Sequence, residues 1–531
     1  MADTDPLALT HARVLTLEQG DAGLVPGEAA LIVDGVIAAV GSEEEIRARA
    51  PAGTEFRGLD GRTVVPGFVD AHIHPIFHGL SLEGVPCLPP RVNSIADLRL
   101  EVERTAAAAP DGAWVWGQGY DDTRLEERRH PRREDLDDVS GGRPVVLTRV
   151  CGHMCVANSR ALELAGVDAR TPDPPGGRIE RDADGEPTGL LLENAEELVL
   201  RHVVHGRDAV ERAIRRVSDD LLRHGITSCC DAWLGYTDGQ DERDVWIDAI
   251  ESGAFRPGIS FLAHHSVWRE DPKRYIDGPL DVIGVKLVAD GSVSGGSAGV
   301  SERFHEDDDR RLFVYEPDEL IEICRDVAAR GLVVAIHAMG DEAISMALDA
   351  IEHSGPANRG HRIEHCTLPT PADIGRMARL GVTPVMQPIF LFAEGEAYRS
   401  KLGEERSSWA NPARAMLDAG VTVALGSDAP ATTWGDPTDV LLGIETSAVR
   451  RTWAGSSLGE QESTTVAEAL AAYTRNAGRA AGFRDRGAIE PGTRADLAVL
   501  SEDPIRTPLE EIHRIDVTAT VLGGEVAFGE L

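Results

Sequence analysis

The sequence is poor in positive charge, and above all in lysine. It has 53 lysine and arginine residues against 89 aspartate and glutamate residues, a formal net charge of -36, and its only lysines are Lys273, Lys286 and Lys401. Proteins that bind nucleic acids neutralise phosphates with Lys and Arg. The balance therefore argues against a nucleic-acid partner, and the acidity favours solubility instead.

Long apolar runs are absent as well. The sequence contains no stretch of about 18 apolar residues, the length that a helix needs to cross a bilayer. Its first residues, MADTDPLALTHARV, lack the basic and apolar parts of a secretory signal. Seven cysteines, an odd number in a long chain, fit a reduced protein better than a disulfide framework. We expect a cytoplasmic protein that acts on a small molecule without a membrane partner, with a homodimer as the base-rate expectation.

Apolar strand-like runs alternate with helical patterns through most of the 531 residues. Such alternation predicts a parallel sheet covered by helices. Eight runs qualify as strands: 64–72, 225–232, 257–265, 282–290, 332–338, 361–366, 382–388 and 421–429. Eight strands with intervening helices favour an α/β fold of the (β/α)₈ barrel type, in which the reacting groups sit at the C-terminal ends of the strands.

The remaining segments predict two additions to the barrel of residues 64–485. Both chain ends, 1–63 and 486–531, alternate short strands with turns such as Asp34-Gly35. Because termini often lie close together, we expect them to build one small β-sandwich, with two separate terminal hairpins as the alternative. Residues 76–224, about 150 in number, are too many for a connection and predict an inserted subdomain that covers the substrate.

The stretch VVPGFVDAHIHP, residues 64–75, carries two histidines at the end of the first predicted strand. Alternate residues of a strand project to one face, so His72 and His74 point the same way. Neutral imidazole is the commonest side-chain ligand for zinc and iron. The pair therefore predicts half of a metal site, although two exposed histidines can occur on a strand by chance.

Other polar residues lie at later strand ends. His337 ends strand 5, His365 ends strand 6 and Asp428 ends strand 8. Each has an ordinary alternative: a core histidine for His337, a strand cap for His365 and a helix N-cap for Asp428. Because a barrel brings all strand ends to one mouth, their joint occurrence favours a metal centre.

Lys286 lies in the apolar strand 4 sequence VIGVKLVADG. A lone buried ammonium is costly, and burial lowers the pKa of the amine. A neutral amine can take up CO₂ to become a carbamate, an anionic group able to bridge two cations. The alternative is a lysine whose charge reaches water at the strand end.

Several motifs together resemble the amidohydrolase superfamily, and within it the YtcJ-like metal-dependent hydrolases of the amidohydrolase 3 family, which include N-substituted formamide deformylases. The motifs are PGFVDAHIHP, CGHMCVANSRAL, GGRIERDADGEPTGLLLENA, GVKLVADGS, IHAMGDEAI, HRIEH, QPIF, LGSDAP and IEPGTRADLAVL. The resemblance implies a (β/α)₈ hydrolase with one or two divalent metal ions, usually Zn²⁺. It implies these ligands: His72 and His74 for one metal, His337 and His365 for the other, Lys286 as carboxylated bridge, and Asp428 as ligand and base.

The resemblance and the physics of metal-bound water predict hydrolysis of a C–N bond, in an N-formyl or N-acyl amine or another amide. A metal lowers the pKa of bound water from about 15.7 to near 7, and Asp428 would pass the water proton to the departing nitrogen. Ester hydrolysis, deamination or decarboxylation on the same scaffold stay open because fold alone does not fix the reaction. A metal-free, non-catalytic scaffold is a further alternative.

Candidates for substrate binding come from two regions. In the insertion, WVWGQGYDD places Trp116, Gln118 and Tyr120 where they could line an apolar pocket, with ordinary core packing as the alternative for the tryptophans. His153, in CGHMC, matches a family position expected near the substrate. Asp290 and Ser292 follow Lys286. One open assignment is a second zinc site at Cys151 and Cys155, which lacks a further Cys or His pair in the insertion. The other is the role of Glu193, which matches a recurrent family glutamate and for which support of a ligand, or packing, is favoured over metal ligation.

Overall fold

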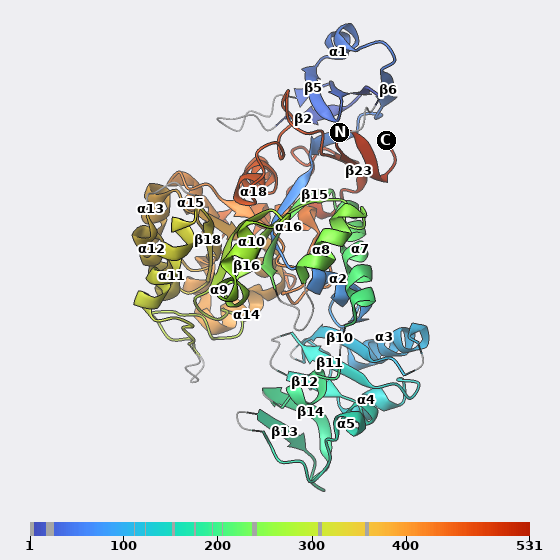
Figure 1. Cartoon of the computed structure of the whole chain (residues 1–531), viewed down its shortest axis with the longest axis vertical. Coiled ribbons are helices and arrows are strands. Elements are labelled where there is room, and N and C mark those ends of the chain that lie inside the picture. The colour runs from blue at the N-terminus through green and yellow to red at the C-terminus, as the bar shows by residue number, and fades with distance from the viewer. Residues whose placement is uncertain are drawn as a thin grey trace. The chain divides into compact units, whose positions relative to one another are not determined.

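The computed structural model divides into two compact units (Figure 1). The barrel unit comprises Met1–His74, Ser218–Asp428 and Thr438–Leu531, and the inserted unit comprises Pro75–Val217 and Ala429–Pro437. The structure describes residues 5–16, 26–110, 112–122, 124–150, 154–174, 177–193, 195–203, 205–235, 242–305, 311–355 and 360–531. The domain limits expected from the sequence stay predictions.

Eight parallel strands form a nearly closed barrel, which confirms the predicted fold class. In order around the sheet they are β8 (Phe68–Ile73), β15 (Ile226–Leu234), β16 (Gly258–His264), β17 (Val282–Val288), β18 (Val333–Ala338), β19 (Arg362–His365), β20 (Thr383–Met386) and β21 (Ala424–Leu425). The segment after β21 returns to β8, because the amide of Asp428 donates to the carbonyl of His72 at 2.7 Å. The ends of the first and last strands therefore meet.

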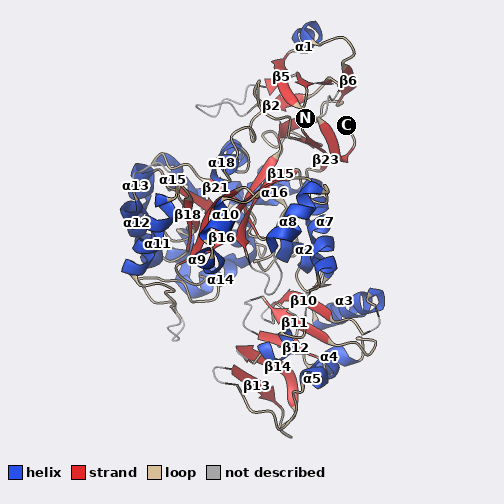
Figure 2. Ribbon diagram, in the orientation of Figure 1, coloured by secondary structure: helices blue, strands red, loops and turns tan. Residues whose placement is uncertain are grey.

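Helices cover the outside of this sheet (Figure 2). They are α8 (Glu242–Glu251), α9 (His265–Glu270), α10 (Pro272–Ile276), α11 (Pro317–Ala329), α12 (Asp341–Ser354), α13 (Pro371–Leu380), α14 (Pro388–Ser408), α15 (Ala413–Asp418), α16 (Val440–Val449), α17 (Val466–Ala472) and α18 (Arg475–Ala480), with 3₁₀ turns at Glu460–Glu462 and Leu509–Arg514. The strands are buried on both faces, as a parallel sheet under helices requires. In the described part of the chain, every helix is too short or too polar to span a lipid bilayer.

The first predicted strand, 64–72, is wrong as a single element. Gly67 divides it into β7 (Thr63–Pro66), which pairs with a terminal sheet, and β8 of the barrel. A Cβ at Gly67 would lie 2.3 Å from the side chain of Thr227. Only glycine allows the chain to pass this close to β15 while it changes sheets.

Two further sheets contain strands from both chain ends. One has β1 (Leu7–Thr10), β4 (Ala29–Val33), β5 (Val36–Gly41) and β6 (Glu55–Gly58), with α1 (Glu43–Arg49) beside it; the other has β2 (Arg13–Leu15), β3 (Pro26–Gly27), β7, β22 (Leu497–Leu500), β23 (Val517–Leu522) and β24 (Glu525–Gly529). Leu9 and Ile32 of the first sheet and Val499 and Val521 of the second share one core cluster. The two sheets therefore pack on each other as a sandwich.

The inserted unit has its own six-stranded sheet, in the order β13-β14-β12-β11-β10-β9. Its strands are β9 (Val85–Pro86), β10 (Val115–Tyr120), β11 (Val145–Arg149), β12 (Met154–Ala157), β13 (Gly177–Arg181) and β14 (Pro187–Glu193). Its helices are α2 (Pro75–Glu83), α3 (Ile95–Ala108), α4 (Arg133–Asp137), α5 (Ser159–Ala165) and α6 (Glu197–Leu200), and α7 (Arg207–Arg223) contains the boundary with the barrel unit.

Candidate metal centre

Four imidazole rings gather at the C-terminal ends of the barrel strands. His72 lies in β8, His74 follows it, His337 lies in β18 and His365 ends β19. Ring centroids are 5.4 Å apart for His74 and His72, 4.9 Å for His72 and His365, and 4.5 Å for His365 and His337. The barrel thus brings together rings that the chain separates by more than half its length.

The carboxylate of Asp428 lies among these rings. Its Oδ1 is 2.9 Å from His74 Nε2 and 3.2 Å from His72 Nε2, and its Oδ2 is 3.9 Å from His365 Nδ1. Burial opposes ionisation, but the neighbouring imidazoles hold the pKa of this carboxyl well below its usual range. Asp428 has a φ of 55° and His365 a φ of 67°, a left-handed backbone that is uncommon for non-glycine residues but more accessible to aspartate and histidine than to most.

A buried ion pair fixes the orientation of His72. Glu364 accepts a hydrogen bond from His72 Nδ1 at 2.5 Å, and Arg362 donates to both oxygens of Glu364 at 2.7 and 2.8 Å. All three side chains are fully buried. Because Nδ1 donates its proton to Glu364, Nε2 presents a lone pair to the centre of the site.

His365 is oriented in the same way by an amide. Gln387 Nε2 donates to the carbonyl of Val385 at 3.3 Å, so Gln387 Oε1 faces His365 Nδ1, 2.8 Å away. The Nδ1 proton of His365 is therefore used, and Nε2 is left with a lone pair. Phe390 stacks on the ring with centroids 5.8 Å apart.

Lys286 reaches the same place from β17. Its Nζ lies 3.3 Å from His72 Nε2, and the residue is 2% exposed. Burial lowers the pKa of the amine. Among the described residues Lys286 forms no ion pair with a carboxylate, so the buried amine has an imidazole as its neighbour and no anion of its own.

His337 and the loop after β17 form the other side. His337 Nε2 donates to the carbonyl of Gly291 at 3.2 Å and lies 3.5 Å from Asp290 Oδ1, and burial lowers the pKa of the ring to about 4. Asp290 is buried and accepts from the amides of Gly299, Met339 and Gly340 at 2.8 to 3.0 Å. Asp290 thus holds the loops together, and its contact with a substrate stays a prediction.

Ser292, the other loop residue expected to meet the substrate, is half-buried. Its Oγ accepts from the amide of Gly295 at 3.1 Å, and its own amide donates to Ser297 Oγ at 3.1 Å. These bonds shape the loop, and the predicted substrate contact of Ser292 stays a prediction.

The donor set fits a divalent cation. One ligand atom each of His72, His74 and Asp428 lies within 4.8 Å of the others. Asp428 Oδ1 is buried and accepts no hydrogen bond among the described residues although two imidazole nitrogens are near it. A carboxylate oxygen facing an imidazole lone pair calls for a cation between them, and N/O donors of this kind suit Zn²⁺.

Two residues beside this cluster were missed in the sequence. Trp233, near the end of β15, stacks on His264, the last residue of β16, with ring centroids 4.1 Å apart and an interplanar angle of 6°. The Trp233 ring also lies 6.1 Å from the His74 ring. Burial lowers the pKa of His264 to about 4. The strand-end position of His264 was the available signal, since it matches that of His337 and His365.

The predicted residues of the inserted unit lie in β10. Trp116 packs against an apolar cluster and meets the ring of His205, with centroids 5.3 Å apart. Tyr120 is fully buried in the core of this unit, and its hydroxyl lies 3.0 Å from His130 Nδ1. Gln118, which lies between Trp116 and Tyr120 in the sequence, is half-buried. Their roles in substrate binding stay predictions.

Other expected positions in this unit are only partly described. His153 and Cys151 lie outside the described residues, and so does the side chain of Glu193, which ends β14. Cys155 is buried in β12, and burial raises the pKa of its thiol above its usual range. The assignments at these positions stay predictions.

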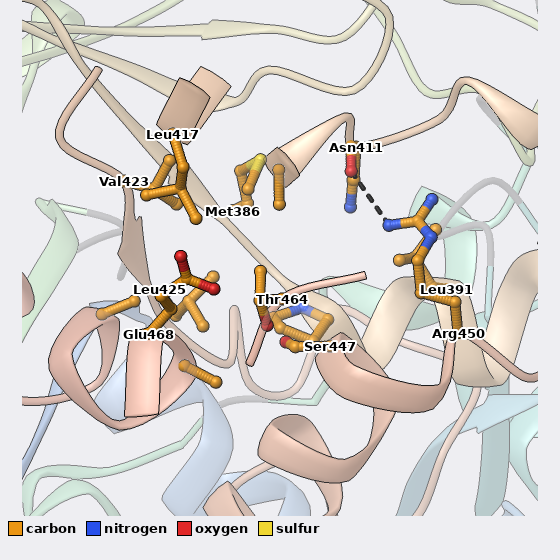
Figure 3. Close-up of a pocket in the computed structure, with 14 residues that line it drawn as sticks. Met386, Leu391, Asn411, Leu417, Val423, Leu425, Ser447, Arg450, Thr464 and Glu468 are labelled. Carbon is orange, nitrogen blue, oxygen red and sulfur yellow. Dashed lines mark hydrogen bonds between the residues drawn. The ribbon is translucent and has the colours of Figure 1, made fainter. Parts of the chain in front are cut away.

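A pocket in the barrel unit lies apart from the strand-end cluster (Figure 3). It is mainly apolar and is lined by residues of β20, β21, the helices α14 to α17 and the segments that connect them: Met386, Pro388, Leu391, Asn411, Ala413, Leu417, Val423, Leu425, Ser447, Arg450, Thr464, Glu468, Ala469 and Ala472. None of the histidines of the candidate centre lines it, so the chemistry of the centre does not depend on this pocket.

Comparison with known proteins agrees with the geometry. A model of the amidohydrolase family matches residues 55–528. Amidohydrolase YtcJ of Bacillus subtilis (strain 168) is 33% identical over 526 residues, covering 96% of this chain and 97% of its own. N-substituted formamide deformylase of Arthrobacter pascens is 32% identical over 551 residues, covering 99% of each chain. The crystal structure of a metal-dependent hydrolase from Pyrococcus horikoshii OT3 matches with a TM-score of 0.75 at 25% identity, covering 95% of this chain and 99% of its own.

Proposed function

Because the chain belongs to the amidohydrolase family and hydrolyses C–N bonds, we propose that it uses divalent metal ions, with Zn²⁺ first, and that its substrates are small amides such as N-formyl or N-acyl amines. The resemblance noted in the sequence motifs is confirmed by the family match. The formamide deformylase relative and the metal-dependent hydrolase neighbour support the finer points of substrate class and metal.

His72, His74 and Asp428 would hold one ion, and His337 and His365 a second. The supporting observation is the convergence of His72, His74 and Asp428 on a point where a buried carboxylate oxygen accepts no hydrogen bond. A divalent ion bound there makes water acidic and polarises a carbonyl oxygen. The chain contributes ligand geometry, since the hydrogen bonds to Glu364 and Gln387 keep two Nε2 lone pairs aimed at the site.

Lys286 would be carboxylated in the metal-bound protein. Its neutral Nζ would attack CO₂ and release one proton, which gives a carbamate whose single negative charge is shared by two oxygens. A buried amine whose pKa is lowered by burial, with no carboxylate partner among the described residues, supports this assignment. Carbon-13 bicarbonate should therefore give a carbamate NMR signal in the wild-type protein that is absent in Lys286→Met, and a signal that survives the substitution would contradict it.

Asp428 would move the proton during hydrolysis. Its carboxylate is ionised at neutral pH because its pKa is held low, so it can accept a proton from the attacking water. It then returns this proton to the nitrogen as the C–N bond breaks, which is necessary because an amide anion is a poor leaving group. The side chains of Asp428 and His74 are only 7% and 16% exposed, which limits the access of bulk water to the site.

Two measurements test the proposal. Elemental analysis of the purified protein should find a divalent metal, and chelation followed by dialysis should abolish amine release from a panel of formamides, acyl amino acids, lactams and esters. His72→Ala should lose both metal and activity, whereas His353→Ala, an exposed histidine of α12, should keep both. Full activity after chelation, or turnover of esters alone, would contradict the proposal.

A further inference from the structure

Trp233 and His264 form a stacked pair of aromatic rings at the C-terminal ends of β15 and β16. Their rings stack at 4.1 Å, and Trp233 meets the His74 ring with an edge at 6.1 Å. His264 ends β16 at the level of Lys286 in β17, its partner in the register. Registered residues of parallel strands project to the same face, and Lys286 reaches His72 inside the barrel, so His264 projects toward the candidate centre as well.

The position of the proton on His264 follows from its neighbour Ser266. His264 is the N-cap of α9, and its Nδ1 accepts from the amide of Ser266 at 3.4 Å and lies 2.7 Å from Ser266 Oγ. A backbone amide can only donate, so Nδ1 carries a lone pair and the proton of the neutral ring is on Nε2. Among the described residues, Nε2–H has no hydrogen-bond acceptor.

The neighbouring His265 is held differently. Its Nδ1 lies 3.1 Å from the hydroxyl of Tyr315, and their ring centroids are 5.9 Å apart. His265 is therefore occupied by a contact of its own, and His264 is the member of the pair that presents a donor beside the centre.

We propose that His264 Nε2–H donates a hydrogen bond to the carbonyl oxygen of the scissile amide, and that Trp233 positions the His264 ring for this contact. This inference rests on the proposed amide hydrolysis. As the water oxygen bonds to the carbonyl carbon, the π electron pair moves onto the carbonyl oxygen, where His264 stabilises the negative charge. The same pair re-forms the C=O bond as the C–N bond breaks and the nitrogen takes its proton from Asp428, so His264 keeps its proton throughout.

A pair of substitutions separates donor from stacking. His264→Phe keeps a ring against Trp233 but removes the N–H, and kcat for amide hydrolysis should fall about 10²- to 10³-fold with little change in KM and unchanged metal content. The side-chain amide of His264→Gln can place an N–H near the original donor, so its kcat should be about tenfold or more above that of His264→Phe. His353→Phe on α12 is the matched control and should leave kcat unchanged.

Nitrogen-15 NMR of histidine-labelled protein provides a second readout, because it reports which ring nitrogen carries the proton. The signals lost in His264→Phe should show a protonated Nε2 and an unprotonated Nδ1, and the reverse tautomer would overturn the inference. A kcat within threefold of wild type in His264→Phe would also overturn it, and so would loss of metal, which would make His264 a ligand. A wild-type protein that releases no amine from the whole panel contradicts the proposed function and this inference together.

Discussion

Glu364 and His72 share a hydrogen bond of 2.5 Å although 292 positions separate them in the chain. Glu364 is also paired with Arg362. Burial alone would raise the pKa of Glu364, but the guanidinium outweighs this effect and holds the pKa well below its usual range. Arg362 in turn donates to the carbonyls of Ala71 and Ala480. The orientation of a candidate metal ligand is thus fixed by a network that ties β19 to β8 and α18.

Glu364→Gln should weaken metal binding about 10- to 100-fold. With the glutamine oxygen in place of Oε2, its NH₂ group would face the Nε–H of Arg362, donor against donor, and His72 Nδ1 would donate to a neutral oxygen in place of an anionic one. The same substitution leaves the Arg362 guanidinium buried without an anion, which should lower the free energy of unfolding by roughly 3–5 kcal/mol. Competition with a chelator measures the first effect, and urea unfolding measures the second.

Glu468→Gln is the matched control for that experiment. Glu468 forms a partly exposed pair with Arg414, with both N–O distances at 2.9 Å, and lies outside the metal centre. Its loss should cost about 1 kcal/mol or less and leave the affinity for metal unchanged. Equal metal affinity in wild type and Glu364→Gln would show that His72 needs no orienting carboxylate.

Asp428→Asn should reduce amide hydrolysis much more than hydrolysis of an activated ester. General acid–base catalysis contributes about 10²- to 10⁴-fold, and the departing amine needs the returned proton while an activated alcohol does not. Rates are compared per bound metal, since Asp428 is also a candidate ligand. Equal losses on the two substrates would contradict its assignment as proton shuttle.

The sequence predicted the barrel and its strand-end histidines because both depend on local patterns. Apolar runs mark the strands, and a parallel barrel brings the ends of all strands to one mouth, so the sequence alone is enough to group His72, His337 and His365. The break of the first strand at Gly67 escaped prediction because its cause is the side chain of Thr227, a contact across the sheet.

The residues that orient the ligands were also beyond the sequence. Glu364 in HRIEH and Gln387 in QPIF were visible as motif residues, yet their partners, His72 and His365, depend on which side chains the strands bring face to face. The stacking of Trp233 on His264 likewise joins two strand ends, and nothing in the intervening 30 positions of the sequence predicts it.

The metal-free protein should lose stability as the pH falls from about 6.5 to about 4. Burial lowers the pKa of His337 to about 4 in the folded state, whereas the unfolded chain has an ordinary histidine near 6.5. Between these values the unfolded state binds more protons, so protonation favours unfolding by about 3 kcal/mol for this residue across the window. Urea unfolding of chelated protein at several pH values measures it.

His337→Asn isolates the contribution of His337 in that series. The variant should show a shallower dependence of unfolding free energy on pH between 4 and 6.5 than wild type, because one depressed histidine has been removed. Above pH 7 the two slopes should agree. Parallel curves throughout the acid range would mean that His337 titrates normally in the folded protein.

Arg450→Met should destabilise the barrel unit without touching the metal centre. Arg450 is 1% exposed, and its guanidinium donates to the carbonyls of Leu458, Asn411 and Ala410 at 2.8, 3.0 and 2.6 Å; the Asn411 contact is drawn in Figure 3. Methionine fills similar volume but leaves three buried acceptors unpaired, which should cost roughly 3–5 kcal/mol. Arg451→Met, which removes an exposed pair with Glu510, should cost about 1 kcal/mol or less. Thermal and urea unfolding of Arg450→Met and Arg451→Met measure the two losses of stability. Equal losses would show that the three carbonyls find other donors.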